Sequence, residues 1–135
     1  MINYIMKNFL LVICLSLTIV SCKKNGVQPK GYIGTWEMLQ QTGTITGATT
    51  NFSTGEGNLL VLNLDSTYQK FVKFNQASKG TYRIVKSGVN WANTTYDAIY
   101  FDSNTRADFI ILNGNELTIG NTFPDGVTTL YERRN

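Results

Sequence analysis

The chain has 135 residues, a formal net charge of +3, 16% charged residues, two cysteines and no histidine. This weak charge balance gives no indication of a nucleic-acid partner. Histidine is the commonest general base and metal ligand, so its absence argues against zinc sites and Ser-His or Cys-His dyads. We therefore expect no enzyme activity, no catalytic residue, no metal and no cofactor.

The N-terminus combines one positive charge with a short apolar run. Lys7 is the only charged residue before Lys23, and residues 9–20 are almost continuously apolar. A helix that spans a bilayer needs roughly 20 apolar residues, whereas this shorter run is typical of a cleaved secretory signal. We predict that residues 1–21 form a signal peptide; the alternative is a buried N-terminal core element.

The apolar run ends in Ile19-Val20-Ser21-Cys22, which resembles the lipobox of bacterial lipoproteins. In that family the cysteine thiol receives a diacylglyceryl group, the signal is cut before the cysteine, and the new amine is acylated, commonly with palmitate. The resemblance implies that Cys22 carries lipid, and several acyl chains together give stable membrane anchoring. The alternative is an ordinary signal with an incidental cysteine.

Residues 22–31 are predicted to be a lipidated tether, because three lysines, Asn25-Gly26 and a proline offer little to bury. Lys23-Lys24-Asn25 lack the aspartate that resembles an inner-membrane retention signal of enteric bacteria. They also lack an acidic run that resembles the surface-export signal of Bacteroidota lipoproteins. We expect attachment to the outer membrane, with the domain facing the periplasm.

Residues 32–135 are predicted to be one all-β domain, because β-branched and aromatic residues form short runs between Gly, Asn, Asp and Ser. Leu60, Leu62 and Leu64 share one face of the strand over 58–64. Asn113-Gly114 is the strongest hairpin signal. Further strands are predicted from Gly34 and over 67–74, 80–86, 96–102, 106–112, 116–120 and 127–133. About eight antiparallel strands favour a closed up-and-down barrel over a sandwich, because closure leaves no free edge.

Residues 42–57 are rich in threonine and glycine and nearly uncharged. We expect them to extend the first strand briefly and then to form a long loop. Loops of this length serve as binding loops in some compact domains, and a solvated loop with no task is the alternative.

The first and last strands carry short signatures, Gly34-Thr35-Trp36 and Tyr131-Glu132-Arg133, with Leu64-Asp65-Ser66-Thr67-Tyr68 and Gly80-Thr81-Tyr82 between them. Together they resemble the lipocalin-like lipoproteins of Bacteroidota over nearly all of residues 31–135. The resemblance implies a lipocalin-like barrel in which the tryptophan plugs the closed end and an arginine packs across it.

In that family the glycine allows close approach of the chain. The resemblance thus implies structural barrel-closure roles for Gly34, Trp36 and Arg133, with Arg134 as the alternative arginine.

If Trp36 points inward, strand alternation sends Met38 and Gln40 inward and leaves Glu37 and Leu39 on the outer wall. An aromatic, mostly uncharged lumen could hold a small apolar ligand, or it could be packed solid with its own side chains. The residues expected to line a ligand are Met38, Tyr68, Val72, Phe74, Tyr96 and Tyr100.

Acidic residues raise two further possibilities, a calcium loop and a glycosidase carboxylate pair. Asp102-Ser103-Asn104 begins like a calcium loop, but Arg106, Ala107 and Asn113 occupy positions that such a loop gives to other residue types. The scattered carboxylates read as surface charges and not as a glycosidase pair: Glu37, Glu56, Asp97, Asp108 and Glu116.

Asp65-Ser66-Thr67 resembles the O-glycosylation site of exported Bacteroidota proteins, with Ser66 as the acceptor, although turn formation alone explains these residues.

Two functions remain open from the sequence. The first is a membrane-anchored envelope lipoprotein whose barrel binds a small apolar ligand. The second is a structural or protein-interaction component of the cell envelope, with a filled barrel and no ligand.

Overall fold

The computed structural model describes residues 31–43 and 47–135. Within these residues the chain forms nine strands: β1 (Gly34–Thr42), β2 (Thr49–Asn51), β3 (Leu59–Leu62), β4 (Thr67–Val72), β5 (Asn75–Trp91), β6 (Thr94–Phe101), β7 (Asp108–Asn113), β8 (Glu116–Gly120) and β9 (Thr128–Arg134). In this part of the chain, no helix is long and apolar enough to cross a membrane.

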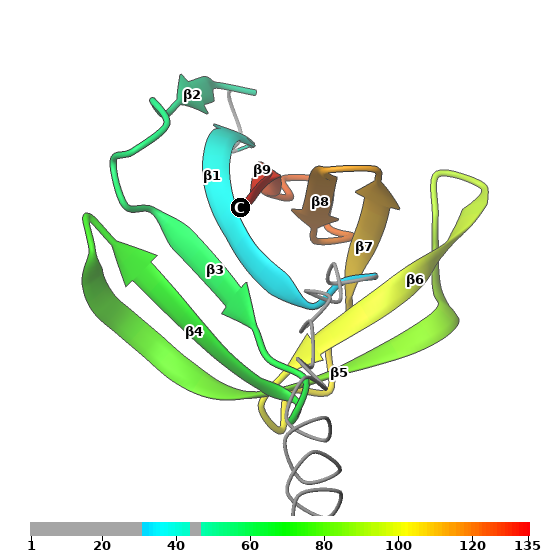
Figure 1. Cartoon of the computed structure of the whole chain (residues 1–135). Coiled ribbons are helices and arrows are strands. Elements are labelled where there is room, and N and C mark those ends of the chain that lie inside the picture. The colour runs from blue at the N-terminus through cyan, green and yellow to red at the C-terminus, as the bar shows by residue number, and fades with distance from the viewer. Residues whose placement is uncertain (1–30, 44–46) are drawn as a thin grey trace, which may run out of the picture.

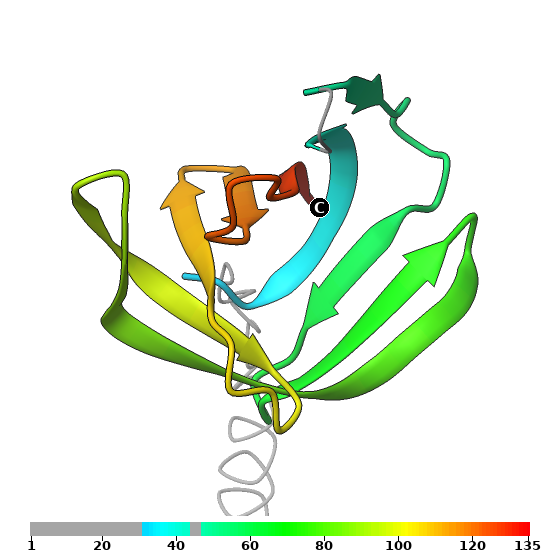
Figure 2. The same ribbon diagram turned by 180° about the vertical axis from the view of Figure 1, so that it is seen from behind.

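The strands form one antiparallel sheet that closes on itself (Figures 1 and 2). β1 pairs with β3 over its first half and with β2 over its last three residues. Its other edge pairs with β9 along most of its length, which closes the barrel. The expected all-β fold is confirmed as a lipocalin-like up-and-down barrel of eight strands, with β2 as an additional strand.

Tight turns set the strand lengths. The predicted β7–β8 hairpin forms, but its two turn residues are Gly114 and Asn115, because Asn113 is still in β7 and pairs with Glu116. Gly114 has the positive φ, 61°, that this tight turn requires. Lys73 and Phe74 also have positive φ values, 50° and 64°, so the chain reverses two residues earlier than the sequence pattern suggested. β4 consequently ends at Val72, and β5 runs for 17 residues from Asn75.

The β3–β4 turn also differs from expectation. Leu64 was predicted to continue the inward face of Leu60 and Leu62, but β3 ends at Leu62 and Leu64 lies in the turn with 84% of its surface exposed. The turn is held by Asp65, whose carboxylate accepts hydrogen bonds from both the backbone amide and the hydroxyl of Thr67.

The apolar core fills one half of the barrel. Alternate residues of each strand point inward, and the largest fully buried side chains are Trp36, Leu60, Leu62, Ile99, Ile110 and Leu117. Full burial of side chains of this size stabilises the fold by about 1.5–3 kcal/mol each. This half of the lumen is therefore packed by the protein itself.

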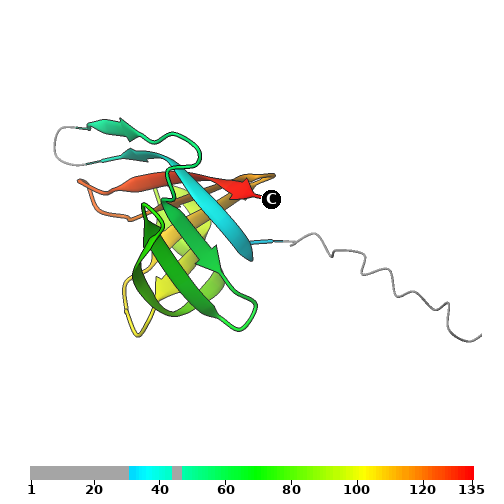
Figure 3. The same cartoon turned by 60° about the vertical axis from the view of Figure 1, so that its left-hand side comes forward.

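The two ends of the barrel differ, and β1 and β9 define them. At the closed end β1 begins and β9 finishes, with Thr35 opposite Arg134. At the open end β1 finishes and β9 begins, with Thr42 opposite Thr128. Figure 3 shows the β1–β2 hairpin at the open end and the C-terminus at the closed end.

Candidate functional site

The open half of the barrel contains a cavity of about 320 Å³. Its walls come from strands β1, β4, β6, β7, β8 and β9 and from the loop between β8 and β9, so the lumen itself forms it. The lining residues are Met38, Gln41, Lys70, Phe101, Asp108, Ile119, Gly120, Asn121, Val127, Thr129 and Tyr131. Its volume lies at the lower end of the range for small-molecule pockets.

A β-bulge decides which glutamine of β1 lines this cavity. Met38 pairs with Tyr131, but Gln40 pairs with Leu130, so Leu39 is an extra residue on β1. The alternation of side chains therefore reverses after Met38. Gln40, predicted to point inward, instead hydrogen-bonds Asn51 of β2 on the exposed side, and Gln41 lines the cavity.

Lys70 brings a positive charge into the cavity from β4. Its Nζ lies 4.2 Å from the centroid of the Phe101 ring and 5.5 Å from that of Tyr68, which are cation–π distances. Burial lowers the pKa of Lys70 because it removes water from the ammonium group, and the nearby carboxylates of Asp108 and Asp102 work in the opposite direction.

Asp108 brings a negative charge into the same cavity from β7. It stands opposite Ile99 of β6, a fully buried core residue, and so faces the lumen. Burial raises the pKa of the Asp108 carboxyl, while the charge of Lys70 acts to lower it. Of the two ion pairs present among the described residues, Lys86–Asp97 and Arg134–Glu37, neither includes Lys70 or Asp108.

Tyr131 forms part of the wall between the cavity and the packed core. It is 7% exposed, and burial raises the pKa of its hydroxyl to about 12. The group is therefore neutral at physiological pH. It offers a ligand an aromatic surface and no charge.

The closed end is sealed by the segment that leads into β1. The Arg133 guanidinium lies 4.1 Å from the Trp36 ring centroid and donates hydrogen bonds to the carbonyls of Ile33 (2.8 Å) and Gly31 (2.7 Å). The Trp36 indole donates to the carbonyl of Tyr32 at 2.9 Å. Arg133, and not Arg134, thus packs over the tryptophan.

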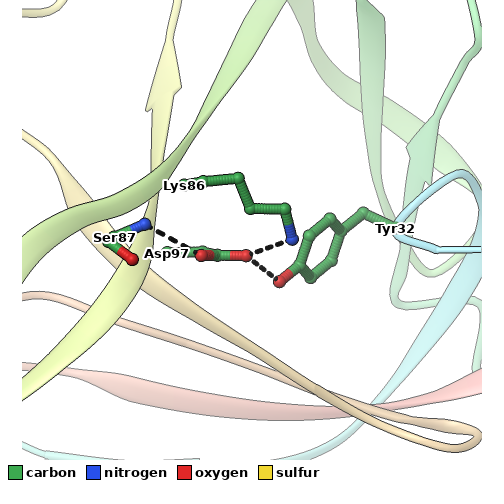
Figure 4. A network of polar contacts seen from close by, with 4 residues as sticks. All are labelled: Tyr32, Lys86, Ser87 and Asp97. Atoms are coloured by element: carbon green, nitrogen blue, oxygen red, sulfur yellow. Dashed lines mark hydrogen bonds and ion pairs between the residues drawn. The ribbon is translucent and has the colours of Figure 1, made fainter.

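A polar network fixes the same segment to the opposite wall (Figure 4). The Tyr32 hydroxyl donates to Asp97 Oδ2 at 2.7 Å, and Lys86 Nζ donates to the same oxygen at 2.6 Å. The backbone amide of Ser87 donates to Asp97 Oδ1 at 3.0 Å. The hydrogen bonds from Lys86 and Tyr32 lower the pKa of Asp97 to about 2, and burial together with the Asp97 carboxylate raises the pKa of Tyr32.

The residues expected to line a ligand fall into different environments. Met38 lines the cavity, and Tyr68 is buried in the core, with its hydroxyl donating to Asp102 at 2.9 Å. Val72 and Phe74 lie outside the cavity at the β4–β5 turn, with exposed fractions of 55% and 59%. These two are not lining residues, because Val72 is the last residue of β4 and Phe74 lies in the turn that follows it.

Tyr96 and Tyr100 are also outside the lumen. β6 turns Ile99 inward, so alternation places both tyrosines on the outer wall. Tyr96 packs 5.6 Å from Phe109, and Tyr100 lies 3.5 Å from the Arg83 guanidinium. The sequence did not decide which face of β6 points inward, because apolar residues occur on both faces of this strand.

Of the residues that line the cavity, the sequence predicted Met38 alone, and those it missed include Gln41, Lys70 and Asp108. The sequence did contain a signal for Lys70, because strand alternation places it on the same face of β4 as Tyr68 and Val72, which were predicted to point inward. Asp108 likewise shares its face with Ile110 and Leu112. Asp108 was predicted to be a surface charge, because charged residues are seldom buried, and no position was predicted for Lys70.

Two residues were predicted to be modified, Cys22 by lipid and Ser66 by a glycan. Cys22 lies outside the described residues. Ser66 is exposed in the β3–β4 turn with a φ of 64°, and its backbone amide donates to the Asn63 carbonyl. Within the described ranges, no group of three or more Asp, Glu, His or Cys side chains could hold a metal ion.

No family model, curated protein or solved structure matches the chain. The functional interpretation therefore depends on the chain's own residues and geometry.

Proposed function

We propose that the protein is a lipid-anchored component of the bacterial cell envelope that binds a small molecule in the open half of its barrel. The observation that carries this proposal is the cavity of about 320 Å³ inside the lumen. A barrel of eight strands is just wide enough for its own side chains to fill, so a space of this size beyond the packed core is available to a ligand.

The placement of the tether supports the same proposal. Gly31, where the proposed tether joins the domain, is bound by Arg133 at the closed end. The cavity includes Gln41 and Thr129, which pair with each other near the other end of β1. A domain anchored through Cys22 would accordingly present its open end away from the membrane surface.

The experiment that tests ligand binding is native mass spectrometry of the full chain, purified gently from its own membrane. We expect a bound small molecule that is absent from a Thr129→Trp variant, since Thr129 is buried in the cavity wall and a large indole would fill the space. Thr122→Trp, at a half-buried loop position outside this cavity, is the control. A ligand-free mass for the unmodified sequence would contradict the proposal.

The anchor is tested separately. Cys22→Ala should move the protein from the membrane fraction to the soluble fraction, because lipid cannot be attached without the thiol. Retention of this variant on membranes at high salt would contradict lipidation of Cys22.

An interaction role remains the second candidate, and the outer wall favours it. Trp91 is 39% exposed and stacks on Phe109 at 5.0 Å, while Phe123 is 48% exposed. Exposed aromatic side chains are common at protein interfaces. If Trp91→Ser removes a crosslinked envelope partner while Thr129→Trp does not, the interaction role is the better description.

A further inference from the structure

The cavity contains two opposite charges that do not form an ion pair with each other. Lys70 belongs to β4 and Asp108 to β7, which are three strands apart in the sheet order. Both side chains line the cavity, and neither takes part in an ion pair with a described residue. Both charged groups therefore face the cavity.

Both charges are poorly solvated in this position. Burial disfavours the charged form of each group, as the lowered pKa of Lys70 and the raised pKa of Asp108 indicate. Lys70 has a cation–π contact with Phe101, but this contact supplies no hydrogen-bond acceptor. A buried charge is stabilised best by an opposite charge with good hydrogen-bond geometry.

The rest of the lining is divided between apolar and polar groups. Met38, Ile119 and Tyr131 provide apolar and aromatic contacts, and Gln41 and Asn121 provide amide groups. This composition differs from the aromatic, mostly uncharged lumen that the sequence suggested. A purely apolar ligand would give neither charge a hydrogen-bonding partner and would remove their remaining water.

We propose that the ligand of this cavity is a small zwitterion, whose anionic group binds Lys70 and whose cationic group binds Asp108. Its aliphatic or aromatic body packs against Met38, Ile119 and Tyr131. This assignment of ligand class depends on the proposed function, because it concerns the same cavity.

Zwitterions with separated charges provide direct probes. The probes are ω-amino acids of four, six and eight carbons, and the singly charged controls are hexanoate and hexylamine. Binding to the purified full chain is measured by ligand-observed NMR and by calorimetric titration. We expect at least one ω-amino acid to bind about tenfold more tightly than either control, because each charge gains a charge-assisted hydrogen bond.

Two variants test the roles of the charges separately. Lys70→Met keeps the length of the side chain and should reduce the affinity for the ω-amino acid to that for hexylamine. Asp108→Asn should reduce it to that for hexanoate. Lys79→Met and Glu116→Gln change exposed charges outside the cavity and should leave the affinities unchanged.

The assignment is overturned if hexanoate or hexylamine binds as tightly as every ω-amino acid, or if no probe binds. It is also overturned if Lys70→Met and Asp108→Asn still bind the ω-amino acid more tightly than hexanoate and hexylamine. These outcomes differ from failure of the proposed function. A small molecule that co-purifies with the native protein, and is lost in Thr129→Trp, would keep the binding role even if it is not a zwitterion.

Discussion

The hydroxyl of Tyr32 donates a 2.7 Å hydrogen bond to Asp97, which lies 65 residues later on the opposite wall of the barrel. This bond fixes the segment before β1 across the closed end. Asp97 also accepts from Lys86 and from the Ser87 amide, so one carboxylate joins three parts of the chain. The closed end therefore depends on the ionised form of Asp97.

Asp97→Asn should lower the free energy of unfolding by about 1–2 kcal/mol at pH 7, after allowance for solvent screening. The pKa of this carboxyl falls from 3.8 to about 2 on folding, so its contribution is fully present above about pH 4. It is lost as the pH falls toward 2 and should be about half as large at pH 3. Urea unfolding at pH 7 and pH 3 measures the difference.

Asp125→Asn is the matched control, because Asp125 is exposed in the β8–β9 loop. Its effect should be close to zero at both pH values. If Asp97→Asn had the same effect at pH 3 as at pH 7, the carboxylate network would not be the cause.

Arg133→Met should destabilise the domain by about 2–3 kcal/mol. The change removes the cation–π contact with Trp36 and two hydrogen bonds to backbone carbonyls at the closed end. Arg134→Met should cost no more than about 1 kcal/mol, because Arg134 is 42% exposed and lies 3.9 Å from Glu37. Urea unfolding followed by tryptophan fluorescence compares the two; equal losses would contradict the assigned roles.

Gly120→Ala should destabilise the fold by about 1–3 kcal/mol through overpacking. A Cβ at this position would collide with the Phe109 ring and would lie 2.8 Å from Thr128 Oγ1. Phe109→Leu should relieve part of the collision, so the double variant should be more stable than the sum of the single effects predicts. Strictly additive unfolding free energies would show that the two residues do not interact.

Ser66→Ala should remove any glycan from the protein if Ser66 is the acceptor that its sequence context resembles. The hydroxyl lies in an exposed turn, so the substitution should leave the unfolding midpoint nearly unchanged. Intact-mass measurement of the protein purified from its own membrane gives the result. A retained sugar mass in Ser66→Ala would assign the modification to another residue.

The all-β class and most strands could be predicted because they depend on local patterns. Alternating Leu60 and Leu62, the turn glycine Gly114 and the run from Glu116 to Gly120 each specify their structure within a few residues, although the turn lies one residue later than predicted. The end of β4 could not be predicted, because positive φ values at Lys73 and Phe74 are not typical of those residue types.

The candidate site was less predictable because it depends on which face of each strand points inward. In β6 both alternate sets contain aromatic or aliphatic residues, so Tyr96 and Tyr100 could be placed on either side. The burial of Lys70 and Asp108 depends on a cavity made by strands distant in sequence. Local pattern favours the surface for both residues.

The extra residue at Leu39 divides β1 into two parts whose side-chain alternation is independent. Trp36 and Met38 belong to one part, and Gln41 belongs to the other. During evolution, gain or loss of one residue at this position would exchange the side chains offered at the open end while the closed end kept its pairing. A single insertion or deletion would thus change the side chains that line the cavity, without any substitution in the packed core.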